Sequence, residues 1–157
     1  MKPLKIIFLL SFTCFLCFFS CTTVDVYERS LPVPGHAWYN SFRPTFDFTI
    51  KDTSSPYQPL LILRHNEKYH YSNIYVNISI EKPGQDSAQK FQLDLPLAGK
   101  DGKWLATGMD DIYEHRIGLF ERPQYLKAGH YKFTVEQIMR ENPLQNVYDV
   151  GIRVEKQ

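Results

Sequence analysis

The thiol of Cys21 is the side chain whose sequence context points most directly to a chemical modification. It follows the small residue Ser20 at the end of an apolar run, Ile6–Phe19, and that run begins after Lys2 and Lys5. A basic start and an apolar run shorter than the roughly 20 residues of a bilayer span are typical of a secretory signal peptide. The cysteine at its end predicts lipidation of Cys21. An ordinary cleaved signal or a membrane-anchored start are the alternatives.

Cleavage before Cys21 limits the charged groups and thiols that the mature chain retains. Removal of residues 1–20 leaves 137 residues, with 16 basic residues against 17 acidic ones. A charge of about −1 gives no basic surface for nucleic acid and no attraction to anionic lipid. Acyl chains on Cys21, palmitate among them, must therefore hold the protein on the membrane. Cys14 and Cys17 leave with the signal, so no thiol remains for a disulfide, a metal or a nucleophile.

A polar segment, residues 64–73, lies between two apolar stretches and mixes hydrogen-bonding with aromatic side chains. Loops on a rigid scaffold commonly carry recognition, and Tyr and Arg are favoured at the centres of interfaces. The candidate contacts for a partner or a glycan are Arg64, His65, Tyr69, Tyr71 and Asn73. The alternative is structural: Arg64 pairs with a carboxylate while the two tyrosines cover a sheet end.

Two groups of side chains have donor atoms suited to metals, but their spacing favours solvated loops. His65 and His70 flank Glu67, whereas a zinc site needs three or four converging ligands. Asp110–Asp111 with Glu114 offer hard oxygens for calcium, but no Asp-x-Asp-x-Asp-Gly loop follows. The chain also lacks a Gly-x-Ser-x-Gly elbow, a phosphate loop and a dinucleotide fingerprint. We therefore expect no metal, no cofactor and no catalysis.

The elements that must position these side chains are strands. Apolar residues alternate with polar ones in five segments, which predicts strands with one buried face. These segments are 46–50, 74–80, 91–97, 131–135 and 150–154. Residues 60–63 are apolar on both faces, as in a central strand covered on both sides. Residues 104–107 are expected to form a short strand, and residues 110–120 fit a strand better than a short helix.

Turn signals separate these segments, and no long helical pattern is present. Pro83-Gly84, Ala128-Gly129 and Asn142-Pro143 are examples. Eight or nine short strands with such turns predict an all-β fold, an antiparallel β-sandwich of immunoglobulin-like or jelly-roll type. The expected organisation is a signal peptide over residues 1–20, lipidated Cys21 and a tether over 21–35, and one sandwich domain over 36–157. Part of the tether could pair as an edge strand.

Several segments resemble the gliding-motility lipoprotein family called GldH. They are Trp38, the run FDFTIKDTSSPY (46–57), the run LRHNEKYHYSNIYVNISI (63–80) and the closing GHYKFTVEQIMRENPLQNVYDVGIRVEK (129–156). The part from Gln137 to Gly151 is the most distinctive. The resemblance implies a cell-envelope lipoprotein of Bacteroidota, in the outer membrane and facing the periplasm. It further implies a non-catalytic role in the gliding apparatus, linked to type IX secretion, with other envelope proteins of that apparatus as partners.

Two further expectations follow from the compartment. Asp86-Ser87-Ala88 resembles the short O-glycosylation signal on exported proteins of these bacteria, which makes Ser87 a candidate modification site. The alternative function is a membrane-anchored carbohydrate-binding module. That function would require a flat, exposed row of aromatic side chains, for example Tyr75 beside Tyr69 or Tyr71.

Overall fold

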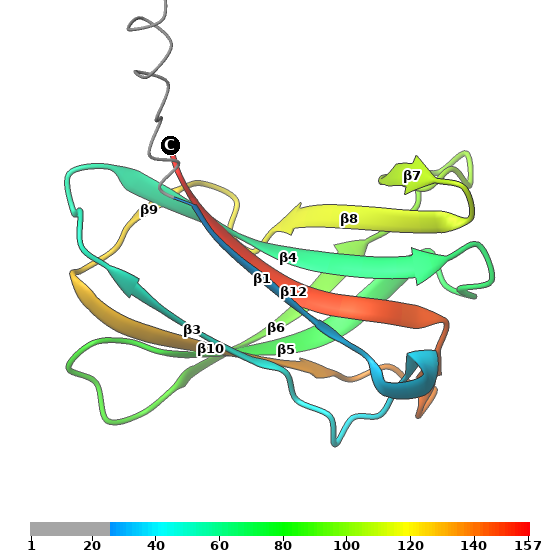
Figure 1. The fold of residues 1–157 in the computed structure, drawn as a ribbon, viewed down its shortest axis with the longest axis horizontal. Coiled ribbons are helices and arrows are strands. Elements are labelled where there is room, and N and C mark those ends of the chain that lie inside the picture. The colour runs from blue at the N-terminus through cyan, green and yellow to red at the C-terminus, as the bar shows by residue number, and fades with distance from the viewer. Residues whose placement is uncertain (1–25) are drawn as a thin grey trace, which may run out of the picture.

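The computed structural model describes residues 26–157, which form a sandwich of two antiparallel β-sheets (Figure 1). The larger sheet contains, in spatial order, β1 (Val26–Pro32), β12 (Val147–Lys156), β4 (Pro56–Asn66), β8 (Ile112–Gly118) and β7 (Thr107–Met109), and β9 (Gln124–Tyr125) also pairs with β4. The smaller sheet contains β3 (Thr45–Ile50), β10 (Gly129–Gln137), β5 (Asn73–Glu81) and β6 (Gln89–Pro96). A short ladder joins β2 (Ala37–Trp38) to β11 (Leu144–Gln145), next to the 3-10 turn η2 (Pro34–His36). The expected antiparallel β-sandwich is confirmed.

The two-residue alternation of the sequence sets which side of each strand is buried. In β3, Phe46, Phe48 and Ile50 are buried, while Asp47 and Thr49 are exposed. The same alternation holds along β5, β10 and β12, so the inner faces of both sheets supply the apolar core. The phenyl ring of Phe48 packs against Phe133 with 5.2 Å between ring centroids. Burial of these faces is the main stabilising term for a domain without disulfides.

β4 is the central strand of the larger sheet and is buried on both faces at its middle, from Leu61 to Leu63. Leu61 and Leu63 point into the core, and Ile62, on the outer face, is only 1% exposed. Ile62 is buried although no further layer of secondary structure in the described residues packs on this outer face. Its cross-strand neighbours are Gly151 on β12 and Arg116 on β8, and the aliphatic part of a long side chain such as that of Arg116 can shield an apolar neighbour from water.

Three segments test the finer expectations for the strands. Residues 26–32 of the expected tether belong to β1, which pairs with β12 along its whole length, so the sandwich includes residues before His36. Trp104 forms only an isolated bridge with Ala98, and the short strand β7 follows it at 107–109. Residues 112–118 form strand β8, as expected, because the inward position of His115 continues the alternation of Tyr113 and Ile117.

The sandwich has two distinct ends, which the strand register defines. Val26 lies opposite Glu155, and Glu155 lies opposite Gln58, so the chain enters at the end where β12 finishes and β4 begins. We call this the proximal end. It also holds the C-terminus and the loops 51–55 and 82–88 (Figure 1). The opposite, distal end holds the loop 67–72, the turn 110–111 and the loop 138–143.

The part of the chain from Val26 onward contains no helix long and apolar enough to cross a membrane. The signal peptide and Cys21 predicted from the sequence lie outside the described residues.

Candidate functional site

The candidate contact residues of the segment 64–73 do not lie on one surface. Arg64 is exposed on the outer face of β4, whereas His65 and Tyr69 point inward and are 0% and 4% exposed. The Tyr69 hydroxyl donates to the Asn73 carbonyl at 3.1 Å, and burial raises the pKa of Tyr69 well above its usual value. Asn73 begins β5 in the other sheet and donates to Asp94. Of the five candidates, Arg64 is the side chain most accessible to a partner.

The tyrosines proposed for glycan stacking also fail to form a flat row. Tyr75 is 39% exposed on β5, but Tyr69 is buried. The rings of Tyr69 and Tyr71 meet edge to face, with an angle of 72° between their planes. A sugar ring stacks on an exposed aromatic face, which the buried Tyr69 does not offer beside Tyr75.

His65 pairs with a second buried histidine that comes from a different strand. His115 on β8 is 0% exposed, and its Nε2 lies 2.8 Å from Nε2 of His65. Nδ1 of His65 lies 2.7 Å from the Asn66 carbonyl, so that nitrogen carries the proton and Nε2 of His65 accepts from His115. Nδ1 of His115 is then left without a hydrogen-bond partner.

Aromatic rings enclose this histidine pair and explain its electrostatics. Trp104 meets His65 edge-on with 4.5 Å between centroids, and the rings of Tyr69 and Tyr113 lie within 6 Å of the same imidazole. Burial lowers the pKa of His65 below its usual value. Burial, followed by the neighbouring His65, lowers the pKa of His115 to about 4. Both imidazoles are therefore neutral at pH 7 and belong to the core.

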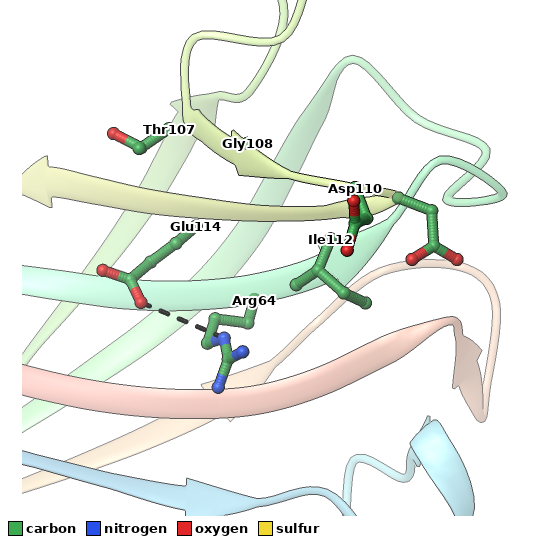
Figure 2. Close-up of a pocket in the computed structure, with 7 residues that line it drawn as sticks. Arg64, Thr107, Gly108, Asp110, Ile112 and Glu114 are labelled. Carbon is green, nitrogen blue, oxygen red and sulfur yellow. Dashed lines mark ion pairs between the residues drawn. The ribbon is translucent and has the colours of Figure 1, made fainter.

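An accessible hollow of about 340 Å³ opens on the outer face toward the distal end, beside β4, β7 and β8 (Figure 2). Arg64 lies at one side of it, with Nε 3.9 Å from Glu114 and Nη1 3.2 Å from Asp149. Asp110 and Asp111 line the hollow where β7 turns into β8. The hollow thus presents one guanidinium group among several carboxylates.

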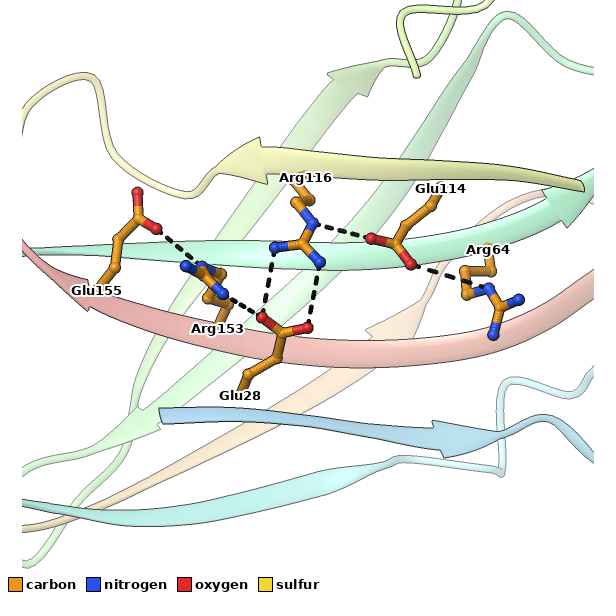
Figure 3. Close-up of polar contacts among 6 residues, drawn as sticks. All are labelled: Glu28, Arg64, Glu114, Arg116, Arg153 and Glu155. Carbon is orange, nitrogen blue, oxygen red and sulfur yellow. Dashed lines mark hydrogen bonds and ion pairs between the residues drawn. The ribbon is translucent and has the colours of Figure 1, made fainter. Parts of the chain in front are cut away.

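Arg64 is also one end of a chain of charged side chains that crosses the outer face of the larger sheet (Figure 3). Glu114 bridges Arg64 to Arg116, and Glu28 bridges Arg116 to Arg153. Glu155 closes the chain on Arg153 at 2.8 Å. Single exposed ion pairs contribute little, about 0–1 kcal/mol, but this series ties β1, β12, β4 and β8 together and orients Arg64.

The metal candidates of the sequence do not converge. His65 is buried and His70 is exposed, so the two cannot share an ion with Glu67. Within residues 26–157, no group of three His, Cys, Asp or Glu side chains is arranged to hold a metal ion. This holds for Asp110, Asp111 and Glu114 as well.

Comparison with known proteins places the chain in a family. Residues 25–154 match the family model described as GldH lipoprotein. The chain belongs to this family. A GldH member is described as a lipoprotein, which agrees with a lipid-anchored location in the cell envelope.

Two relatives of this GldH protein match over most of its length. A protein of Christiangramia forsetii named "Gliding motility lipoprotein GldH homolog" is 29% identical over 157 residues, 96% of this chain and 94% of the relative. The "Gliding motility lipoprotein GldH" of Flavobacterium johnsoniae is 29% identical over 145 residues, 88% of this chain and 89% of the relative. Among solved structures, the chain is similar to a carbohydrate-binding module specific for non-crystalline cellulose. The TM-score is 0.41, with 9% identity, 82% of this chain and 70% of that one.

Several important side chains were not singled out from the sequence. His115, Trp104 and Asp149 come from strands or loops distant in sequence from Arg64 and His65. The one available signal was the position of His115 on the apolar side of an alternating segment, which marks a residue that points inward.

Proposed function

We propose that this protein is a non-catalytic, lipid-anchored component of the gliding motility apparatus, held at the outer membrane and facing the periplasm. It would act in the structure or assembly of that apparatus and of the type IX secretion machinery linked to it. Membership of the GldH family and the names of both relatives support this proposal. The proposed direct partners are other envelope proteins of the same machinery.

The strand register also supports an orientation of the molecule relative to the membrane. Four residues lie between Cys21 and Val26, where β1 begins, so an anchor at Cys21 holds the proximal end within about 17 Å of the lipid. The distal end, with the hollow near Arg64, then faces away from the membrane. We therefore assign partner contact to the hollow lined by Arg64, Asp110, Asp111 and Glu114.

The charges of the hollow favour a contact by complementary ion pairs. Arg64 is 44% exposed in its side chain, and its two carboxylate partners already compensate its charge. Asp110 and Asp111 lie at the rim and have no ion pair in the described part of the chain. A partner with basic side chains would form ion pairs with Asp110 and Asp111. Arg64, which is held by its two carboxylate partners, would fix the position of that partner.

Affinity capture from detergent-solubilised envelopes tests this assignment. The unsubstituted protein is expected to retain at least one other envelope protein, and Asp111→Arg is expected to reduce that retention at least about fivefold by like-charge repulsion. Glu121→Arg reverses a charge in the exposed segment between β8 and β9, at the proximal end, and is the matched control, which should capture normally. Equal capture by both variants would exclude the hollow as the contact, and no captured protein at all would exclude the assembly role.

Intact mass of the protein purified from its own membranes tests both proposed modifications. We expect the chain to start at Cys21 with added acyl groups. We also expect it to exceed the Ser87→Ala variant by at least one sugar, because Ser87 is exposed in the loop 82–88. Thr53→Ala removes another exposed hydroxyl at the proximal end and should leave the sugar in place. A chain with a free thiol would refute the anchor, and equal sugar content in all three proteins would refute glycosylation at Ser87.

A further inference from the structure

β6 is an open edge of the smaller sheet. It pairs with β5 from Gln89 to Pro96, and no strand of the described chain pairs with its other side. The isolated bridge from Ala98 to Trp104 begins only after the strand has ended. With eight residues, β6 is the longest edge strand within residues 26–157. An uncovered edge of this length is a template for pairing with another strand.

The side chains of β6 are less well covered than those of its neighbours. Phe91 and Leu93 point toward the core side but are only partly buried, whereas the opposite residues on β5, Ile78 and Val76, are almost fully buried. The ring of Phe91 meets that of Phe120 edge to face, with 5.8 Å between ring centroids. Apolar area therefore remains accessible along the same edge that carries unpaired backbone groups.

The outer-face residues of β6 are arranged so that the strand complements itself. Lys90, Gln92 and Asp94 alternate along the exposed face. If a second copy pairs antiparallel with Gln92 opposite its own counterpart, each Lys90 lies opposite an Asp94. The same register places Phe91 opposite Leu93 on the core side. Directly opposite residues on one face of an antiparallel pair are close enough for such contacts.

The other long edge strands do not have this property. In β1, Glu28 and Arg29 are adjacent and so lie on opposite faces, which prevents them from being opposite each other in a symmetric antiparallel pair. In β3, Asp47 is the only charged residue, so no opposite charge is available within the strand. Self-complementary charge is thus specific to β6 among these edges.

We propose that β6 is a homodimerisation edge, at which two copies of this chain pair antiparallel about a two-fold axis through Gln92. The two smaller sheets join into one continuous sheet, and the exposed parts of Phe91 and Leu93 are covered by their counterparts. Lys90 also forms an ion pair with Glu136 at 3.2 Å, and its 57% exposed side chain can contact both carboxylates. A symmetric interface of this kind closes at two copies. The inference does not depend on the proposed role in gliding.

Charge exchange between positions 90 and 94 tests the interface and its register together. The mass of the full-length protein in detergent solution is measured by light scattering, with the detergent contribution subtracted. The unsubstituted protein is expected to be a dimer. Lys90→Glu and Asp94→Lys each replace two attractive contacts by two repulsive ones, so the dissociation constant of each variant should rise at least about tenfold.

The decisive measurement is the mass of the protein in a mixture of the two single variants. When the two single variants are mixed, position 90 of one chain meets the opposite charge at position 94 of the other, so dimers should re-form. The double variant Lys90→Glu with Asp94→Lys should also dimerise. Lys100→Glu makes the same charge change in an exposed turn and should have no effect. Restoration by mixing also shows that the single variants are folded.

Three results would overturn the proposal. The first is an unsubstituted protein that stays monomeric up to about 100 μM, a concentration at which even a weak dimer is populated. The second is a dimer that neither single variant weakens. The third is a pair of weakened variants that mixing does not restore, which would place the contact in another register or on another surface.

Discussion

Replacing Gln137 by leucine is expected to lower the free energy of unfolding by about 3 kcal/mol. Gln137 is the last residue of β10 and is 0% exposed. Its Nε2 donates to the Trp38 carbonyl at 3.1 Å, and its Oε1 accepts from the Met139 N–H at 2.8 Å. Leucine has a similar size but no polar atoms, so both backbone groups lose their partner. Urea denaturation of the two proteins measures the difference.

Gln145→Leu is the matched control, because it makes the same chemical change at an exposed residue of β11. Its free energy of unfolding should change by less than about 0.5 kcal/mol. If the two variants lost equal stability, the cost would come from the leucine itself and not from the lost hydrogen bonds. The result also bears on the proposed contact surface, since Gln137 holds the loop 138–143 at the distal end.

Acidification from pH 6.5 to pH 4 is expected to lower the free energy of unfolding by about 3 kcal/mol through His115 alone. The unfolded chain binds a proton on this imidazole near pH 6.5, whereas the folded protein does so only near pH 4. The unfolded state therefore binds more protons in this interval, and stability falls as the pH falls. Well above pH 6.5 the imidazole is neutral in both states, and the contribution of His115 is constant.

The geometry explains why the folded protein resists this proton. The only bare nitrogen of His65 accepts from His115, so a proton there would point two N–H groups at each other across 2.8 Å. The remaining nitrogen, Nδ1 of His115, is buried, and the nearby Leu105 backbone offsets only part of the effect of burial on the pKa of His115. Burial also lowers the pKa of His65, so His65 likewise makes the folded state less stable as the pH falls.

Chemical denaturation at a series of pH values measures how the free energy of unfolding depends on pH. His115→Gln should be less stable at pH 7 but should lose less further stability between pH 6.5 and pH 4.5. His70→Gln changes an exposed histidine and should keep the full slope. Carboxylates with lowered pKa values, such as Glu136 beside Asn77 and Lys90, lose their contribution at lower pH, below about 4.5. A flat profile between pH 6.5 and pH 4.5 would contradict the buried pair.

The strands and their buried faces were predictable from local pattern. The alternation of Phe46, Phe48 and Ile50 with Asp47 and Thr49 has one stable solution, a strand with one face in the core. The same logic gave the antiparallel sandwich and favoured a strand over a helix for residues 110–120. Resemblance of several segments gave the GldH family, which the match over residues 25–154 confirms.

Which polar side chains meet was decided only by the tertiary structure. The segment 64–73 contains the right residue types for recognition, but period-two geometry sends Arg64 outward and His65 inward. The partners Asp149 and His115 come from β12 and β8, and only the register of those strands against β4 brings them near.

Sequence alone therefore determined the fold class, the family and the position of the proposed anchor, because short-range hydrophobic patterns and a terminal signal encode them locally. Strand order and register determined the buried histidine pair, the hollow beside Arg64 and the open edge of β6. The histidine pair and the surroundings of Arg64 depend on contacts between residues 50 or more positions apart, such as His65 with His115 and Arg64 with Asp149. Local propensities do not carry that information.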